Sequence, residues 1–182
     1  MHAIRNFSVL LSLALAAGCS DANSLADPTN TNVVDTVTLG ALEGTPIQTP
    51  SAYSVLSGAV RTDQTTEFEF AYNVEPSGRR VFLPRKVLGL TSTSGANPGV
   101  QASAATFDEI TVALSNGYVT DSAAPVEVGQ RWLVRSRVFC NIGVPQYAKL
   151  EILSFEDSTV TFKVLADNNC GYKGLEPGLP DR

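Results

Sequence analysis

The chain has 182 residues, of which 43% are hydrophobic and 17% are charged, and its formal net charge is −5. This length suits one domain, the apolar content excludes an intrinsically disordered chain, and the acidic balance argues against a nucleic-acid partner. The only histidine is His2, which lies in a segment that we expect to be removed. Catalytic triads and metal sites that need imidazole are then excluded, and we expect a protein that is not an enzyme.

Residues 1–18 have the three-part pattern of a signal peptide. Arg5 lies in a short polar start, the apolar run FSVLLSLALAA follows, and small residues precede Cys19. The apolar run is about 11 residues long, whereas a transmembrane helix needs about 20. The ending LAAGC resembles the bacterial lipobox, in which a signal peptidase cuts before a cysteine that receives lipid, although Ala16 stands where Leu, Val or Ile is usual. An ordinary secretory signal with an incidental cysteine is the alternative.

We therefore expect cleavage after residue 18, lipidation of Cys19 and attachment to a membrane through this lipid. Ser20, rather than an aspartate, follows the cysteine. In the bacterial sorting pattern that this resembles, the serine favours the outer membrane. Residues 19–32 are rich in Asp, Asn, Ser and Thr, which predicts a lipidated cysteine on a flexible tether. The folded domain is expected at 33–182, on the periplasmic or the surface face of the membrane.

Two cysteines remain, Cys140 and Cys170. An exported protein folds in an oxidising compartment, so this even pair predicts a disulfide, with two buried free thiols as the alternative. Closing a loop of about 31 residues would stabilise the fold by roughly 3–4 kcal/mol in the chain-entropy model.

Short runs of β-branched and aromatic residues predict strands from residue 33 onward. In TEFEFAY, Glu67 and Glu69 alternate with Phe68 and Phe70, which places both carboxylates on a solvated face. A loop rich in Gly, Ser and Ala is expected at 92–104, and 107–114 fits either a strand or a short helix. The first five expected strands are 33–39, 53–60, 66–74, 81–83 and 86–91.

The strongest strand pattern covers 131–140, and the clearest hairpin joins 146–154 to 159–166. Apolar residues alternate with polar ones in both arms of the hairpin, so their apolar sides should meet on one face of a sheet. No long segment with helical periodicity follows the signal peptide. The sequence therefore predicts an all-β single domain.

Positive charge gathers in the middle of the chain. Arg131, Arg135 and Arg137 share one face of the expected strand 131–140 with Leu133 and Phe139. Such a face could bind carboxylates or phosphates, or it could pair with the eighteen acidic residues. We treat these three arginines as a candidate ligand-binding face.

Several segments resemble the HmuY-like family of bacterial surface lipoproteins. The hairpin text QYAKLEILSFEDSTVTFKVLAD is similar to a strand pair near the C-terminus of that family, and TEFEFAY is similar to its aromatic-acidic strand. Tyr53-Ser54-Val55-Leu56 resembles its first strand, and the lipobox agrees.

The resemblance implies an all-β domain tethered to the outer membrane that binds haem, in some members through paired histidines. The mature chain has no histidine, so those ligands have no counterpart here. Tyrosine can also ligate haem iron, which leaves Tyr118, Tyr147 and Tyr172 as weak candidates. The function expected from the sequence is therefore a non-catalytic ligand-binding lipoprotein, with haem as the family-based ligand. The alternative is a structural lipoprotein that docks onto another envelope protein.

Overall fold

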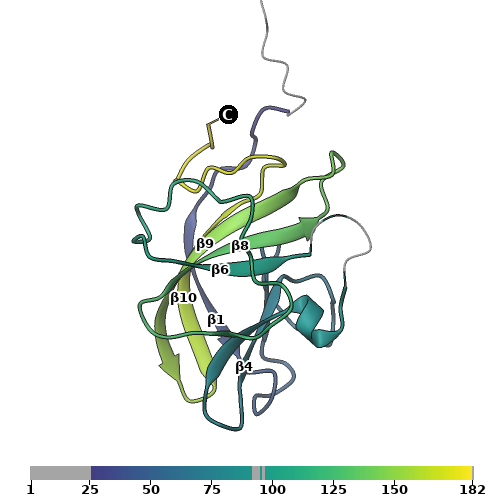
Figure 1. The fold of residues 1–182 in the computed structure, drawn as a ribbon, viewed down its shortest axis with the longest axis vertical. Helices are drawn as coiled ribbons and strands as arrows, with labels where there is room; N and C mark the ends of the chain where they lie inside the picture. The colour runs from purple at the N-terminus through teal and green to yellow at the C-terminus, as the bar shows by residue number, and fades with distance from the viewer. Residues whose placement is uncertain (1–25, 92–94, 96, 182) are drawn as a thin grey trace, which may run out of the picture.

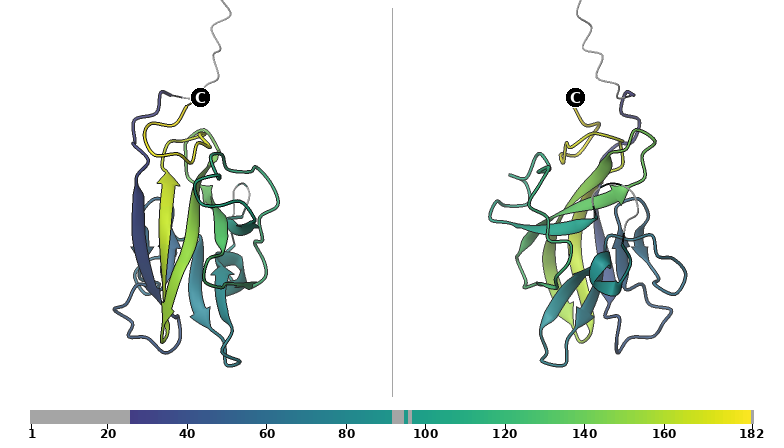
Figure 2. Two further views of the ribbon diagram at one scale, coloured as in Figure 1. Left: turned by 90° about the vertical axis from the view of Figure 1, so that its left-hand side faces the viewer. Right: turned by 45° about the vertical axis from the view of Figure 1, so that its right-hand side comes forward.

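The computed structural model describes residues 26–91, 95 and 97–181, so the expected signal peptide and Cys19 lie outside the described residues. The described chain forms two five-stranded antiparallel sheets that pack face to face (Figures 1 and 2). The all-β prediction is thus confirmed. Among the described residues, no helix has the length and apolar content needed to cross a membrane.

The first sheet has the strand order β1-β10-β9-β8-β6, and most of its strands are long. It contains β1 (Val34–Gly40), β10 (Thr159–Asp167), β9 (Pro145–Glu156), β8 (Arg131–Val138) and β6 (Gly99–Ser103). The second sheet has the order β3-β2-β4-β5-β7 and shorter strands. It contains β3 (Gly58–Val60), β2 (Ala52–Ser54), β4 (Phe70–Val74), β5 (Arg80–Pro84) and β7 (Ala124–Pro125).

The main core lies between the two sheets and is built from alternate residues of their strands. The hairpin of β9 and β10 turns its apolar side inward, as predicted, and aromatic side chains of the second sheet meet it. The rings of Phe70 and Phe82 are tilted against each other with centroids 4.2 Å apart, and Trp132 of β8 packs edge-on to Phe82 at 6.1 Å. The buried residues contributed by the hairpin are Ala148, Leu150, Ile152, Val160, Phe162 and Val164.

A smaller core lies on the outer face of the first sheet. The loop between β6 and β7 and the C-terminal segment cover this face, and Phe107 and Leu175 pack there against Leu133. Lys149, expected on a polar face, is buried under the loop and donates hydrogen bonds to the carbonyls of Phe107 and Ile110 at 2.7 and 2.9 Å. The segment 107–114 is accordingly neither a strand nor a helix but a series of turns with one bridge.

Two further strand predictions and one loop prediction differ from the structure. The expected strand 53–60 is a tight hairpin, β2 and β3, because the chain turns before Gly58. The expected strand 86–91 is instead a 3₁₀ helix, Arg85–Leu88, which Gly89 ends in the left-handed conformation with φ 78°. β6 falls inside the expected loop 92–104; its sequence GVQAS carries little strand preference, and it forms because β8 provides a pairing edge.

Candidate functional site

The three arginines predicted to form a binding face contact three different parts of the chain. Arg131 donates hydrogen bonds to three backbone carbonyls, two of them in the loop between β6 and β7. Arg135 donates to two other loop carbonyls. Arg137 lies within a bulge of β8, between Arg135 and Val138, and pairs with Glu67 at 2.9 Å. The three guanidinium groups thus hold loops in place and form one ion pair.

Glu69 is a charged residue that the sequence pattern placed on the wrong face. It was expected beside Glu67 on a solvated face, but its side chain is fully buried. The backbone amide of Val55 donates a hydrogen bond to Glu69 Oε2 at 2.6 Å. Burial raises the pKa of Glu69 to about 7, against the opposing effects of this hydrogen bond and of the nearby Arg137.

Glu67 has the opposite environment. Its side chain is exposed, and the hydrogen bond from Arg137 lowers its pKa. The two carboxyl groups therefore do not work as a solvent-facing pair. Glu69 packs inside the fold because the β2–β3 turn supplies a donor for it, and the alternation of TEFEFAY gave no sign of that donor.

The tyrosines considered for haem ligation are engaged within the fold. Tyr118 donates its hydroxyl hydrogen to the carbonyl of Leu114 at 2.8 Å, and Tyr172 donates to the carbonyl of Ala26 at 2.9 Å. Tyr147 is buried in the smaller core. Burial raises the pKa of both Tyr118 and Tyr147, whereas ligation by a phenolate is favoured by a lowered pKa.

A groove of about 310 Å³ lies between the edges of the two sheets. Within the described part of the chain, β1 ends the first sheet and β3 ends the second, so each pairs with a strand on one side only. Core side chains such as Tyr53 and Val37 reach the groove, and the half-exposed Leu56 stands at its rim. The accessible lining is about equally polar and apolar, with polar side chains at Thr31, Asp35 and Asn168. The sequence analysis did not predict this groove, because the position of the groove depends on which strands become sheet edges.

The part of the expected tether that the structure describes, 26–32, is held against the domain. Asn169 is the centre of this contact: its side-chain oxygen accepts hydrogen bonds from the amides of Thr29 and Asn30, each at 2.9 Å. Its side-chain nitrogen donates to the carbonyl of Asn30 and to Asp167 Oδ1, each at 2.8 Å. Asn32 pairs with Gly178 through both backbone groups. Residues 29–32 of the expected tether thus make hydrogen bonds with the segment that follows β10.

Cys140 and Cys170 form a disulfide, with their Cα atoms 5.7 Å apart. The bridge joins the segment after β8 to the segment after β10. Cys170 directly follows Asn169, so the disulfide fixes the same part of the molecule that holds residues 26–32. The chain therefore enters the domain at a crosslinked end, which also carries the C-terminus (Figure 1).

Comparisons of this chain with protein-family models, with curated proteins and with solved structures found no match. The resemblance to HmuY-like proteins accordingly stays a prediction from the sequence. In the described residues, no group of three or more His, Cys, Asp or Glu side chains is arranged to hold a metal ion.

Proposed function

We propose that this protein is an exported lipoprotein with a non-catalytic binding domain. The signal peptide 1–18 is removed, Cys19 carries the lipid that holds the protein at the outer membrane, and residues 20–25 connect the lipid to the β-sandwich. The observation that carries the proposal is the Cys140–Cys170 disulfide. Structural disulfides persist in oxidising compartments, which an exported protein reaches and a cytosolic one does not.

The groove between β1 and β3 is the binding site that the geometry supports best. Its volume of about 310 Å³ lies at the lower end of the range for small-molecule sites, about 300–1,000 Å³. Its apolar floor belongs to the main core and is therefore already ordered, which favours binding because little entropy is lost when a ligand arrives. A compact ligand with an apolar side and a hydrogen-bonding side fits this lining.

The tyrosine geometry does not favour haem as that ligand. The hydroxyl groups of Tyr118 and Tyr172 are engaged with backbone carbonyls, and Tyr147 is buried away from solvent. The mature chain also offers no imidazole, since His2 lies in the signal peptide. The fold expected from the HmuY-like resemblance is compatible with this protein, but a haem ligand would need a different set of contacts.

A second candidate function is docking onto another envelope protein. The groove is bordered by two strand edges, β1 and β3, and an unpaired edge offers backbone donors and acceptors to an added strand. Exposed apolar side chains, Val33, Val34 and Leu56, flank these edges. An extended segment of a partner could therefore pair with β1 while its side chains enter the groove.

Fractionation of cells tests the lipoprotein assignment. We expect the full-length protein in the membrane fraction and the Cys19→Ala variant in the soluble exported fraction or retained with an uncut signal. The matched control is the Cys140→Ala/Cys170→Ala double variant, which removes the other two cysteines and should stay with the membrane. A Cys19→Ala variant with unchanged mass and unchanged membrane association would refute the lipid anchor.

Photo-crosslinking distinguishes the two kinds of ligand. A photoreactive amino acid in place of Leu56 should give an adduct in living cells, whereas the same probe in place of Ile47 should not, because Ile47 is similarly exposed but does not line the groove. A small mass increase indicates a small ligand, and a large one indicates a protein partner. Equal labelling at both positions, or none at either, would contradict binding in the groove.

A further inference from the structure

A second and larger hollow lies at the end of the molecule where the chain enters. Its volume is about 590 Å³, and it is formed by the loop between β6 and β7 together with the C-terminal segment 171–181. Val112 of the loop and Leu179 of the C-terminal segment both line this hollow, and their exposed fractions are 59% and 58%. Two prolines, Pro177 and Pro180, add to the apolar lining. Neighbouring apolar side chains this open to water indicate a contact surface.

The hollow lies beside the point at which residues 19–25 join the domain. Tyr172 lines the hollow, and its hydroxyl donates to the carbonyl of Ala26. Ile142, which is 47% exposed, and Ala26 both line an adjoining depression. Cys19 precedes Ala26 by seven residues, and seven extended residues span at most about 25 Å. A lipid on Cys19 is therefore held within that distance of Ala26, whose carbonyl is bonded to Tyr172 in the lining of the hollow.

The charges at this end show what kind of lipid contact is favourable. Glu176 and Asp181 are acidic residues of the hollow, and Lys173, its basic residue, donates to the Ser115 hydroxyl. There is thus no excess of positive charge in the lining to attract anionic headgroups. A contact with a membrane would depend on apolar side chains, and it would need the anchor to keep the domain close to the surface.

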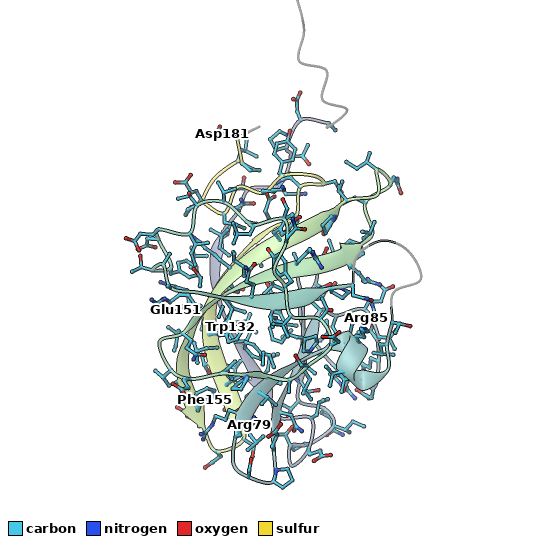
Figure 3. The ribbon with its side chains drawn as sticks, in the orientation of Figure 1. Arg79, Arg85, Trp132, Glu151, Phe155 and Asp181 are labelled. Atoms are coloured by element: carbon cyan, nitrogen blue, oxygen red, sulfur yellow. A yellow bond between two sulfur atoms is a disulfide. The ribbon has the colours of Figure 1, made fainter. Side chains whose placement is uncertain are left out.

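We propose that this end of the domain rests on the lipid surface, with Val112, Ile142 and Leu179 in contact with the membrane interface. The inference depends on the lipoprotein function proposed above and adds a fixed orientation to it. The opposite end, where Arg79 and Phe155 lie far from Asp181 (Figure 3), then points away from the membrane. The occupant is a lipid surface because the anchor brings one within reach.

Site-specific fluorescence on the full-length lipidated protein tests this orientation. Leu179→Cys carries a polarity-sensitive dye, and Val128→Cys is the matched control because Val128 is 60% exposed and lies beside Arg79 and Phe155. The native pair Cys140–Cys170 is oxidised and does not compete for the dye. The proteins are placed in phosphatidylcholine vesicles with or without a spin-labelled lipid that quenches the dye.

We expect the dye at position 179 to shift to shorter wavelength and to lose intensity with the quenching lipid, while the dye at 128 stays unchanged. Equal quenching at both positions, or none at 179 in protein that floats with the vesicles, overturns the orientation but leaves the lipid anchor intact. A blue shift at 179 without lipid quenching would assign the surface to a protein contact and would also overturn it. Protein that does not float with the vesicles, and whose Cys19 has no added mass, contradicts the lipoprotein function itself.

Discussion

Glu69 makes the stability of the domain depend on pH. Its pKa is raised from 4.5 to about 7 by burial, so the folded state binds a proton that the unfolded state has lost over this interval. The free energy of unfolding therefore falls as the pH rises from about 4.5 to about 7 and then levels off. Because each pKa unit corresponds to about 1.4 kcal/mol, the full effect is a few kcal/mol.

The Glu69→Gln substitution removes this titration, so the unfolding free energy of the variant should not decline as the pH rises. We expect the difference in unfolding free energy, variant minus wild type, to increase between pH 5 and pH 8 in urea denaturation. Glu67→Gln is the matched control because Glu67 is exposed and its pKa is lowered by Arg137, so it titrates below this interval. An equal pH dependence in Glu69→Gln and wild type would show that Glu69 does not titrate as described.

At the scale of residues, alternation predicted the inward side chains of the β9–β10 hairpin, and those predictions are confirmed. The same rule failed for Glu69 and Lys149, which were assigned to polar faces but are buried. In both cases another segment supplies the partner: the amide of Val55 for the carboxyl, and the carbonyls of Phe107 and Ile110 for the ammonium. The alternation of residues within one segment does not indicate partners from another segment, so periodicity alone could not predict these contacts.

At the scale of elements, long patterned strands were predictable and short ones were not. Residues 131–140 and the hairpin carry strong alternation, and β8, β9 and β10 form there with nearly the expected bounds. β6 has weak strand preference and depends on the edge of β8. The candidate groove could not be predicted for a related reason, since sheet order decides which strands are edges. The disulfide was predictable because only two cysteines remained to pair.

The contact between residues 26–32 and the C-terminal segment gives a prediction at this scale. Asn169→Ala removes the side-chain hydrogen bonds that hold the backbone amides of Thr29 and Asn30 and the carbonyl of Asn30. We expect faster amide exchange and faster proteolysis near Ala26. Asn168→Ala is the control, because Asn168 accepts its hydrogen bonds through the backbone carbonyl. Equal protection in both variants would show that Asn169 does not hold this segment.

At the scale of the whole molecule, the two ends of the β-sandwich have different surroundings. One end contains the disulfide, and there the first described residue, Ala26, is hydrogen-bonded to Tyr172 of the C-terminal segment. The apolar hollow lies at the same end. The groove between β1 and β3 has Thr31 and Asn168, which lie close to this end, in its lining, and it extends along β1 to Val37.

The mass of the N-terminal peptide tests the central claim most directly. Protein purified from the membrane fraction in detergent is digested, and the first peptide is identified by mass spectrometry. The account predicts a chain that starts at Cys19 and carries the added mass of a diacylglyceryl group, with no peptide from residues 1–18. An unmodified Cys19, or a chain that still begins at Met1, would contradict the assignment of this protein as a lipoprotein.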